Sequence, residues 1–241
     1  MAAKRRSVDA ARSFAARVPG LQQLATPVRD RVRYGEVGPY LSAARRIPGW
    51  LGASEGVALA RAVLSLPPDP TVVEVGSFLG RSTVVLAGAL TVHGGGMVHC
   101  IDPFDGVGDP HSAPVYESIR VGSDRTLRRR FDDNIARAGV TERVRVHVGT
   151  AETVTPRWDE PIDLLFLDGD QSVAGARRAF ALLSPHLRTG GVVALHNSND
   201  RDYAPDHDGH RQIVLRDLPG GDWSDPFTVG TTTFSRRLAP S

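Results

Sequence analysis

Residues 71–87 read TVVEVGSFLGRSTVVLA, and this stretch decides the fold. Its first five residues hold three valines, at positions 72, 73 and 75, which is typical of a short strand buried in a parallel sheet. Gly76 and Gly80 then bracket a tight turn, and a helical pattern begins at Arg81. A strand, a glycine turn and a helix start together favour an anion or a nucleotide, because the glycines allow close approach and the helix start offers free N–H groups.

The spacing of these glycines narrows the class of ligand. The turn reads G-S-F-L-G, with Glu74 two residues before the first glycine. This is not the G-x-G-x-x-G of a dinucleotide fold, so the pattern argues against a nicotinamide cofactor. A tight turn in another kind of α/β protein would show the same letters, and the stretch alone does not separate the two interpretations.

Length and composition limit the classes of protein to which this chain can belong. The chain has 241 residues, which suits one α/β domain with an extension. No apolar run approaches the roughly 20 residues that a bilayer crossing needs, and the basic start lacks the apolar segment of a signal peptide. Cys100 is the only cysteine, which excludes an intrachain disulfide and suits a buried small side chain. We expect a cytoplasmic protein with no membrane partner.

Positive charge is concentrated at the N-terminal end. Up to Arg46 the chain has ten basic and three acidic residues, a local net charge of +7, whereas the whole chain carries +2. The small overall charge does not indicate a nucleic-acid partner. We expect residues 1–46 to form a basic helical extension and residues 47–241 the main domain. The extension is either a solvated surface, a contact for an acidic partner or a subunit interface in a homodimer.

After the opening stretch, strands alternate with helices. A helix opens at Ser54 and Glu55 and is stopped by Pro67, and further elements follow the first strand. Strands are predicted at residues 97–101, 144–148, 162–167 and 192–196, and helices at 124–138, 173–187 and 210–218. This order predicts a doubly wound, mostly parallel sheet with helices on both faces. The tail, residues 226–238, alternates enough for one or two antiparallel strands.

Ligands of open α/β sheets bind beyond the carboxyl ends of the strands, so the residues at these ends are the candidate site. A carboxylate such as Asp102, which follows the second strand, can accept both hydroxyls of a ribose, although an aspartate before Pro103 also suits a plain turn. The full set of strand-end residues is Glu74, Gly76, Ser77, Gly80 and Ser82 after the first strand, Asp102 after the second, Thr150, Ala151 and Glu152 after the third, Asp168 and Asp170 after the fourth, and His196 and Asn197 at the fifth.

Two of these residues suggest a metal. Asp168 and Asn197 offer oxygen ligands at the ends of neighbouring strands, which suits Mg²⁺. A bound magnesium ion can hold a hydroxyl and lower its pKa. The alternative is that both are polar turn residues.

Five segments resemble, in the expected order, motifs of the class I S-adenosylmethionine-dependent methyltransferases. The resemblance is to the small metal-assisted O-methyltransferases that act on sugars and natural products, with catechol O-methyltransferase a more distant relative. The segments are specific for the fold and the cofactor and much less so for the acceptor. They read IPGWLGASEG, VEVGSFLGRST, CIDPFDG, LLFLDGDQS and LSPHLRTGGVVALHN, and they run from residue 47 to residue 197.

This resemblance implies a seven-stranded sheet with an antiparallel last strand, and S-adenosylmethionine and Mg²⁺ as cofactors. The residues of the first glycine turn would hold the methionine half of the cofactor, Asp102 the ribose, and residues 150–152 the adenine. A small-molecule hydroxyl would be the acceptor, and Asp168, His196 and Asp170 would be the catalytic residues. The metal, held by Asp168 and Asn197, would place the hydroxyl beside the methyl group.

The chain departs from the family pattern in two places. The family commonly has D-G-D-H after the fourth strand, with the histidine as a base, but here the fourth position is Gln171, which cannot take a proton. It commonly has H-D after the fifth strand, where this chain has His196-Asn197. The base could instead be His196, Asp170 or a loop histidine at position 111, 207 or 210, or the metal could ionise the hydroxyl without one.

Other functions remain open at this point. The loop of residues 104–122, with Phe104, His111 and Tyr116, is predicted to be a substrate lid, the alternative being a surface insertion. A metal-independent N- or O-methyltransferase would keep the same fold and work by proximity. A non-catalytic protein that has kept the cofactor pocket is the further alternative, and Gln171 is its best support.

Overall fold

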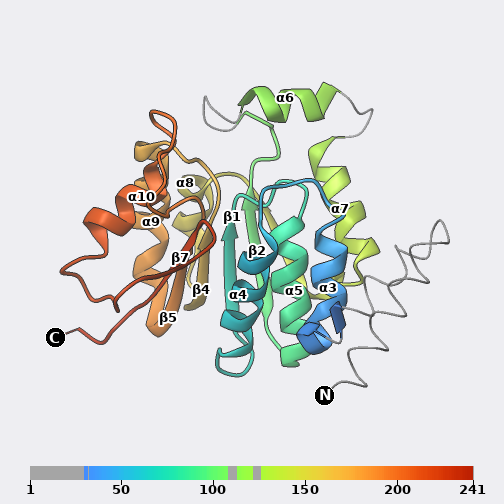
Figure 1. Cartoon of the computed structure of the whole chain (residues 1–241), viewed down its shortest axis with the longest axis horizontal. Helices are drawn as coiled ribbons and strands as arrows, with labels where there is room; N and C mark the ends of the chain where they lie inside the picture. The colour runs from blue at the N-terminus through green and yellow to red at the C-terminus, as the bar shows by residue number, and fades with distance from the viewer. Residues whose placement is uncertain (1–29, 32, 108–112, 122–125, 241) are drawn as a thin grey trace, which may run out of the picture.

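The sheet has the predicted architecture. The structure, a computed structural model, describes residues 30–31, 33–107, 113–121 and 126–240 (Figure 1). Within these ranges, seven strands form one sheet in the order β3-β2-β1-β4-β5-β7-β6. The strands are β1 (Thr71–Val75), β2 (Met97–Asp102), β3 (Val144–Val148), β4 (Ile162–Leu167), β5 (Leu187–Leu195), β6 (Phe227–Val229) and β7 (Thr232–Arg236). The first five pair in parallel, and β7 is antiparallel to β5 and to β6, which confirms the predicted antiparallel last strand.

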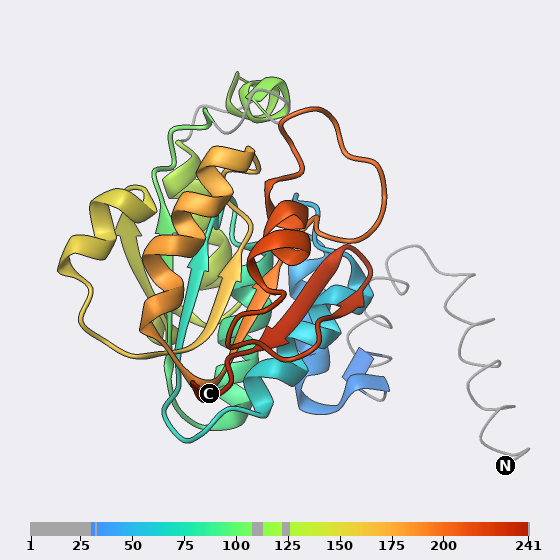
Figure 2. The same ribbon diagram turned by 90° about the vertical axis from the view of Figure 1, so that its left-hand side faces the viewer.

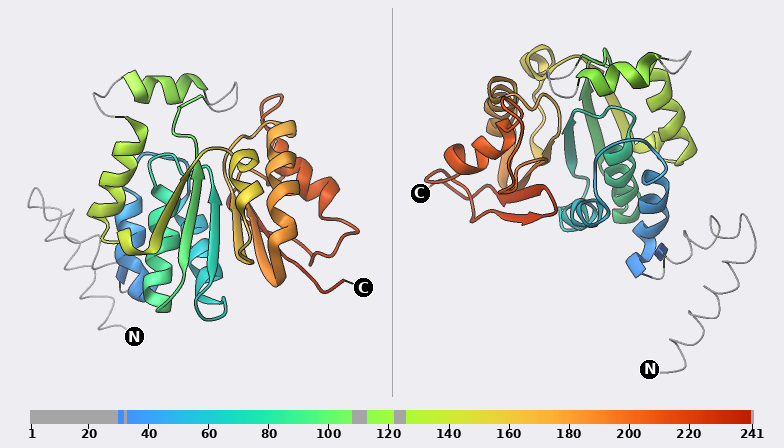
Figure 3. Two further views of the ribbon diagram at one scale, coloured as in Figure 1. Left: turned by 180° about the vertical axis from the view of Figure 1, so that it is seen from behind. Right: turned by 45° about the horizontal axis from the view of Figure 1, so that its top comes forward.

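Helices cover both faces of the sheet, as Figures 1 and 3 show. One face carries α3 (Gly38–Ala44), α4 (Ala53–Leu64), α5 (Arg81–His93) and α7 (Leu127–Arg137), and the other carries α8 (Ala151–Val154), α9 (Val173–Leu183) and α10 (Gly209–Gln212). Short 3₁₀ turns lie at Gly35–Val37, Thr141–Arg143, Thr155–Arg157 and Ser184–His186, and a π-helical segment spans Ile213–Asp217.

The core consists of two apolar clusters, one on each side of the sheet. Val72, Cys100 and Leu164 point into the cluster under α3, α4, α5 and α7, whereas Val73 and Leu165 point into the cluster under α9 and α10. Because the central strands are buried on both faces, β1 and β4 are mostly apolar, with Glu74 and Asp163 as their buried charged residues. Cys100 is fully buried, as expected for a small apolar side chain, and burial raises the pKa of its thiol well above the ordinary value.

The order of the strands creates a place where a ligand can bind. β1 has β2 on one side and β4 on the other. The strands before β4 are therefore added on one side of β1, and the strands from β4 onward on the other side. Such switch points open a crevice at the carboxyl ends of the strands. A further helix, α6 (Ala113–Val121), lies beyond this edge of the sheet, well separated from the strands (Figures 1 and 2).

Several predictions about individual elements differ from the structure, and the first difference depends on a pairing between two strands. β5 begins at Leu187 and runs through Gly190-Gly191, because Leu187 is buried and pairs with Ile162 before a register shift in the ladder. The preceding helix therefore ends at Leu183 and not at residue 187. The predicted helix over 210–218 is instead α10 followed by the π-helical segment, and the predicted irregular loop contains α6.

Most of the predicted extension lies outside the described residues, and the domain boundary at residue 46 stays a prediction. The described part begins at Asp30, whose carboxylate accepts hydrogen bonds from Ser42 Oγ at 2.7 Å and Arg45 Nη1 at 2.5 Å. α3 packs on α5 and contributes Leu41 to the core. None of the helices in the described ranges combines the length and apolar character that a membrane crossing requires.

Replacing Phe131 with alanine tests how strongly α7 is held. Phe131 is fully buried, and its ring packs at 5.2 Å from that of Phe104. We expect a loss of about 3–5 kcal/mol in the free energy of unfolding, measured by urea denaturation. Phe227, which is 60% exposed and stacked on Phe234, is the matched control, and Phe227→Ala should cost about 1 kcal/mol. Equal losses in the two variants would contradict this description of the core.

Candidate functional site

A pocket of about 470 Å³ lies at the switch point, within the usual range of about 300–1,000 Å³ for cofactor and small-molecule sites. It brings together residues that are far apart in the sequence and that the strand-end argument selected. Of the predicted site residues, those that line it are Gly76, Ser77, Ser82, Asp102, Thr150, Ala151, Glu152, Asp168, Asp170, His196 and Asn197. Glu74 and Gly80 do not line it.

Asp102 holds the glycine turn in place. Its Oδ2 accepts the backbone N–H groups of Ser77 and Phe78, each at 2.8 Å, and its Oδ1 accepts that of Phe104 at 2.6 Å. Burial raises the pKa of Asp102, and these three N–H groups partly offset that effect. A carboxylate has about four acceptor positions, so about one remains for a ribose hydroxyl. The structure therefore supports contact with one hydroxyl better than the predicted pair.

Glu74 supports the turn from inside the protein. It is fully buried, and its Oε2 accepts hydrogen bonds from Ser77 Oγ at 2.7 Å and from Thr83 Oγ1. Burial raises its pKa, which these hydroxyl donors partly offset. Glu74 does not line the pocket, and its contacts hold Ser77 and the start of α5; its predicted part in binding the cofactor stays a prediction.

The two glycines of the turn are needed for packing within the protein, a reason that the sequence did not show; close approach to a ligand stays a prediction. A Cβ on Gly76, whose φ is +86°, would lie 2.5 Å from the backbone oxygen of Asp168. A Cβ on Gly80, also at φ +86°, would lie 3.1 Å from the side chains of Ile135 and Phe131. Gly76 thus lets β1 approach β4, and Gly80 lets α5 begin against α7.

The segment after β3 is held next to Asp102. The Gly149 amide donates to the backbone oxygen of Asp102 at 3.1 Å, and the Thr150 amide donates to Thr153 Oγ1 at 2.9 Å. Ala151 is buried, whereas Glu152 is exposed and lies 3.5 Å from the guanidinium of Arg178. Thr150, Ala151 and Glu152 therefore border the same part of the pocket as the carboxylate after β2.

A buried histidine lies between two carboxylates. His196 Nδ1 is hydrogen-bonded to Asp168 Oδ1 at 2.7 Å, and His196 Nε2 lies 3.8 Å from Glu55 Oε1. Burial lowers the pKa of His196, but the carboxylates of Asp168 and Glu55 raise it more, so the pKa lies above the ordinary value. A histidine held in this way is suited to carry a positive charge between two negative ones.

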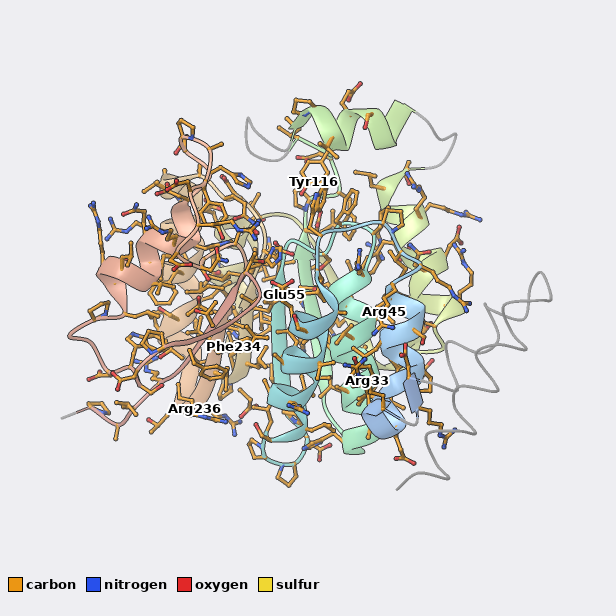
Figure 4. All side chains as sticks on the ribbon, in the orientation of Figure 1. Arg33, Arg45, Glu55, Tyr116, Phe234 and Arg236 are labelled. Carbon is orange, nitrogen blue, oxygen red and sulfur yellow. The ribbon has the colours of Figure 1, made fainter. Side chains whose placement is uncertain are left out.

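Glu55 joins this pair to the C-terminal hairpin. Its Oε1 accepts hydrogen bonds from the Thr231 amide at 2.8 Å, from Thr231 Oγ1 at 2.5 Å and from Thr232 Oγ1 at 3.0 Å. Its Oε2 accepts the Gly52 amide at 2.5 Å. Glu55 lies between α4 and the hairpin in Figure 4. In the sequence, Glu55 was recognised only as a residue at the start of a helix. Its contact with Thr231 was missed because the two residues are 176 positions apart.

The contacts of His196 and Asp170 bear on the catalytic role that was predicted for each of them. Both nitrogens of His196 face protein groups, and Nε2 is buried without a hydrogen-bond partner among the described residues, so it does not present a base to the pocket. Asp170 Oδ1 accepts the Ser172 amide at 2.9 Å at the start of α9. These contacts favour positioning roles for both residues over that of a base.

The other predicted bases lie in different places. His207 lines the pocket. His210 is buried, its Nδ1 is hydrogen-bonded to the backbone oxygen of His196 at 2.8 Å, and burial lowers its pKa to about 4. His111 lies outside the described residues. The amide of Gln171 donates to Asp168 Oδ1 at 3.3 Å, so Gln171 also orients that carboxylate.

The predicted metal ligands meet only in part the needs of Mg²⁺. Asp168 and Asn197 both line the pocket, and Mg²⁺ accepts sites with one or two carboxylates because it keeps several waters. Asp168 Oδ1 is already bonded to His196 and Gln171, which leaves Oδ2 and the Asn197 amide oxygen as donors. In the described ranges, no cluster of three His, Cys, Asp or Glu side chains could hold a metal ion. The donors fit a hydrated Mg²⁺ and do not form a closed metal site.

Three aromatic rings stand at one side of the pocket. The Trp50 ring lies 5.6 Å from that of Phe78 and 5.8 Å from that of Tyr116, and the last two are 5.0 Å apart. Tyr116 belongs to α6 and lies between that helix and the rest of the domain (Figure 4). Tyr116 was predicted as part of a lid, but Trp50 and Phe78 were missed, since each looked like a turn residue in its own motif.

Comparison with known proteins agrees with this geometry. Residues 73–198 match the family model described as a methyltransferase domain. Similar solved structures include the O-methyltransferase NovP, with a TM-score of 0.59 and 18% identity over 78% of this chain and 81% of that one. The O-methyltransferase TomG from Streptomyces achromogenes, solved with S-adenosylmethionine, has a TM-score of 0.55 and 24% identity over 85% and 90%. An O-methyltransferase from Bacillus cereus, solved with S-adenosylhomocysteine, has a TM-score of 0.54 and 20% identity over 86% and 91%.

The fold and the pocket therefore define a class I methyltransferase. Because the family match covers more than half of its 241 residues, the chain belongs to the methyltransferase-domain family. This confirms the predicted resemblance, the predicted fold and the prediction of a methyltransferase. The roles of the individual site residues stay predictions.

The hydrogen bonds of Glu55 predict a pH dependence of stability. Burial raises the pKa of Glu55, but the bonds from Thr231 and Gly52 and the charge of His196 lower it below the ordinary value. A lowered carboxyl pKa stabilises the fold above the unfolded pKa of about 4.3, and the benefit is lost as the pH falls through the folded pKa. We expect Glu55→Gln to cost about 1.5–3 kcal/mol at pH 7. The difference from the unchanged protein should stay constant above about pH 5 and shrink as the pH falls below about 4.3, measured by urea denaturation.

The exposed Glu142 provides the matched control. Glu142→Gln should leave the unfolding free energy within about 0.5 kcal/mol of the unchanged protein at each pH. A pH-independent loss in Glu55→Gln would show that the hairpin contact does not depend on the charge.

Proposed function

We propose that this protein transfers the methyl group of S-adenosylmethionine to a hydroxyl of a small molecule, such as a sugar or a natural product. The observation that supports the proposal is that the turn after β1, Asp102, residues 150–152 and Asp168 border one pocket at the switch point of the sheet. Membership of the methyltransferase-domain family supports the same cofactor. When bound, S-adenosylmethionine supplies an electrophilic methyl group on a sulfonium.

We assign the cofactor to the strand-end side of the pocket. Asp102 would accept a ribose hydroxyl, and residues 150–152 would border the adenine. Gly76, Ser77 and Ser82 would hold the methionine half, where the first turn of α5 offers unpaired N–H groups. Hydrogen bonds to Glu74 and Asp102 fix this turn before any ligand binds, which lowers the cost of binding.

We assign the acceptor to the loop side of the pocket. Trp50, Phe78 and Tyr116 offer apolar ring faces that would exclude water and hold a carbon framework, while Asp168, Asn197 and His207 offer polar groups for a hydroxyl. TomG, which shares this fold, is described as involved in tomaymycin synthesis, and this supports a natural-product acceptor for the present chain as well.

Magnesium assistance is part of the proposal. Asp168 and Asn197 would hold the ion, and its charge would lower the pKa of the acceptor hydroxyl. One observation favours the metal-independent alternative. His196 Nδ1 already occupies Asp168 Oδ1, and the raised pKa of His196 favours its protonated form, whose positive charge would compete with a metal ion for that carboxylate. Transfer would then depend on the proximity of the two substrates.

Titration with S-adenosylhomocysteine tests the cofactor site. We expect binding by isothermal titration calorimetry, and Asp102→Ala should weaken it about ten- to hundredfold, because hydrogen bonds to a charged group are lost. Asp132, which is exposed and paired with Arg128, provides the control, and Asp132→Ala should bind as the unchanged protein does. No binding by the unchanged protein would refute the cofactor assignment.

A metal-removal experiment separates the two forms of the proposal. S-adenosylhomocysteine formation would be followed with a panel of phenols, catechols and sugars, with Mg²⁺ and with EDTA. If Mg²⁺ assists, EDTA should lower kcat at least tenfold, and Asp168→Ala should lower it further. Full activity in EDTA would establish the metal-independent alternative.

A further inference from the structure

Transfer of a methyl group to a hydroxyl leaves a proton that some group must accept. The base has to lie within hydrogen-bond reach of the reacting oxygen, directly or through one water. The position that the family pattern assigns to a base carries Gln171, whose amide has no basic nitrogen. The inference that follows rests on the proposed function and concerns the group that replaces this base.

Three nearby groups are poorly placed for the task. His196 has its Nδ1 on Asp168 and its Nε2 buried towards Glu55. His210 does not line the pocket, is fully buried and is hydrogen-bonded to the backbone oxygen of His196. Asp170 accepts the Ser172 amide at the start of α9. Each is engaged in holding a neighbouring element.

His207 is placed differently. Among the described residues, it is the one histidine besides His196 that lines the pocket, and its side chain is half-buried. It belongs to the segment between β5 and α10, which faces the same pocket as Asp168, Gln171 and Asn197. A half-buried imidazole at the wall of a pocket can both contact a ligand and pass a proton on to solvent.

The backbone around His207 is tied to the segment that carries Gln171. The Gly209 amide donates to the backbone oxygen of Gln171 at 2.9 Å, and Asp206 Oδ1 accepts the Val173 amide at 3.2 Å. The His207 amide itself donates to the backbone oxygen of Ala204 at 3.0 Å. Contacts on both sides of His207 therefore hold it beside the position from which the histidine is missing.

We propose that His207 is the general base of the transfer and takes over the task that Gln171 cannot perform. The acceptor O–H bond breaks as its proton passes to the neutral imidazole of His207. The oxygen forms a new bond to the methyl carbon, and the bond between that carbon and sulfur breaks. The products are the methyl ether, S-adenosylhomocysteine and protonated His207, which then releases its proton to water. Gln171 keeps the role of orienting the Asp168 carboxylate.

The test compares His207→Asn with the unchanged protein, using the best acceptor from the panel of phenols, catechols and sugars. We expect kcat to fall about 10²-fold or more, the usual contribution of a general base. The affinity for S-adenosylhomocysteine, measured by calorimetry, should stay within about twofold. The matched control is His186→Asn, in the 3₁₀ turn just before β5 and at the other end of that strand from the pocket, which should leave both quantities unchanged.

A second variant distinguishes a lost base from a disturbed loop. In the double variant His207→Asn with Gln171→His, the histidine returns to its usual position, and we expect at least a tenfold recovery of kcat. A disturbed loop would not be repaired by a change in the segment after β4. His111→Asn, which changes the remaining candidate, should leave kcat within about twofold.

Several results would overturn the inference. His207→Asn with kcat within threefold of the unchanged protein would do so, as would an equal loss in His111→Asn. A loss without recovery in the double variant would assign His207 a structural role. If the unchanged protein binds S-adenosylhomocysteine but transfers no methyl group to any panel member, the proposed function fails first and this inference with it. That outcome is distinct from failure of His207 alone, in which the unchanged protein is active.

Discussion

The three backbone hydrogen bonds to Asp102 are the interaction on which the site depends. They join the end of β2 to the turn after β1 and to the first residues of the following loop, so three parts of the pocket wall share one carboxylate. This carboxylate needs such partners because it is almost fully buried, and the turn needs it because its amides point into the sheet edge. The hydrogen bonds that these buried polar groups need are thus the same ones that hold the pocket wall together.

A second set of polar contacts connects the strand ends at the opposite side of the pocket to α4 and the C-terminal hairpin. Asp168 after β4, His196 after β5, Glu55 on α4 and Thr231 in the hairpin form one chain of polar contacts between carboxylates, an imidazole and a hydroxyl. A lone charge in this interior would be costly, but alternating charges reduce the cost. The arrangement also explains why the histidine at this strand end is buried and held in one orientation by protein groups.

The sequence predicted the parts of the fold that depend on local patterns. Local patterns marked the strands: a run of valines in β1, a mostly apolar run in β4 and an alternating pattern in the tail. The strand-end argument then selected eleven residues that line one pocket. What it missed depends on long-range contacts. The length of β5 follows from a pairing with Ile162, the glycines at 76 and 80 are needed by β4 and α7, and Glu55 matters because of Thr231. No local pattern contains these partners.

The cofactor was easier to predict than the acceptor, because strand ends border the proposed cofactor site and loops border the proposed acceptor site. The cofactor side is built from strand ends, whose positions the sheet fixes, and each strand end has a recognisable motif. The side of the pocket that we assign to the acceptor contains Trp50, Tyr116 and His207, which come from three separate connections. Connections can exchange residues without disturbing the sheet, so a base lost after β4 can be supplied from the segment after β5. A departure from a family motif on this side therefore calls for a search of the neighbouring loops before catalysis is judged to be lost.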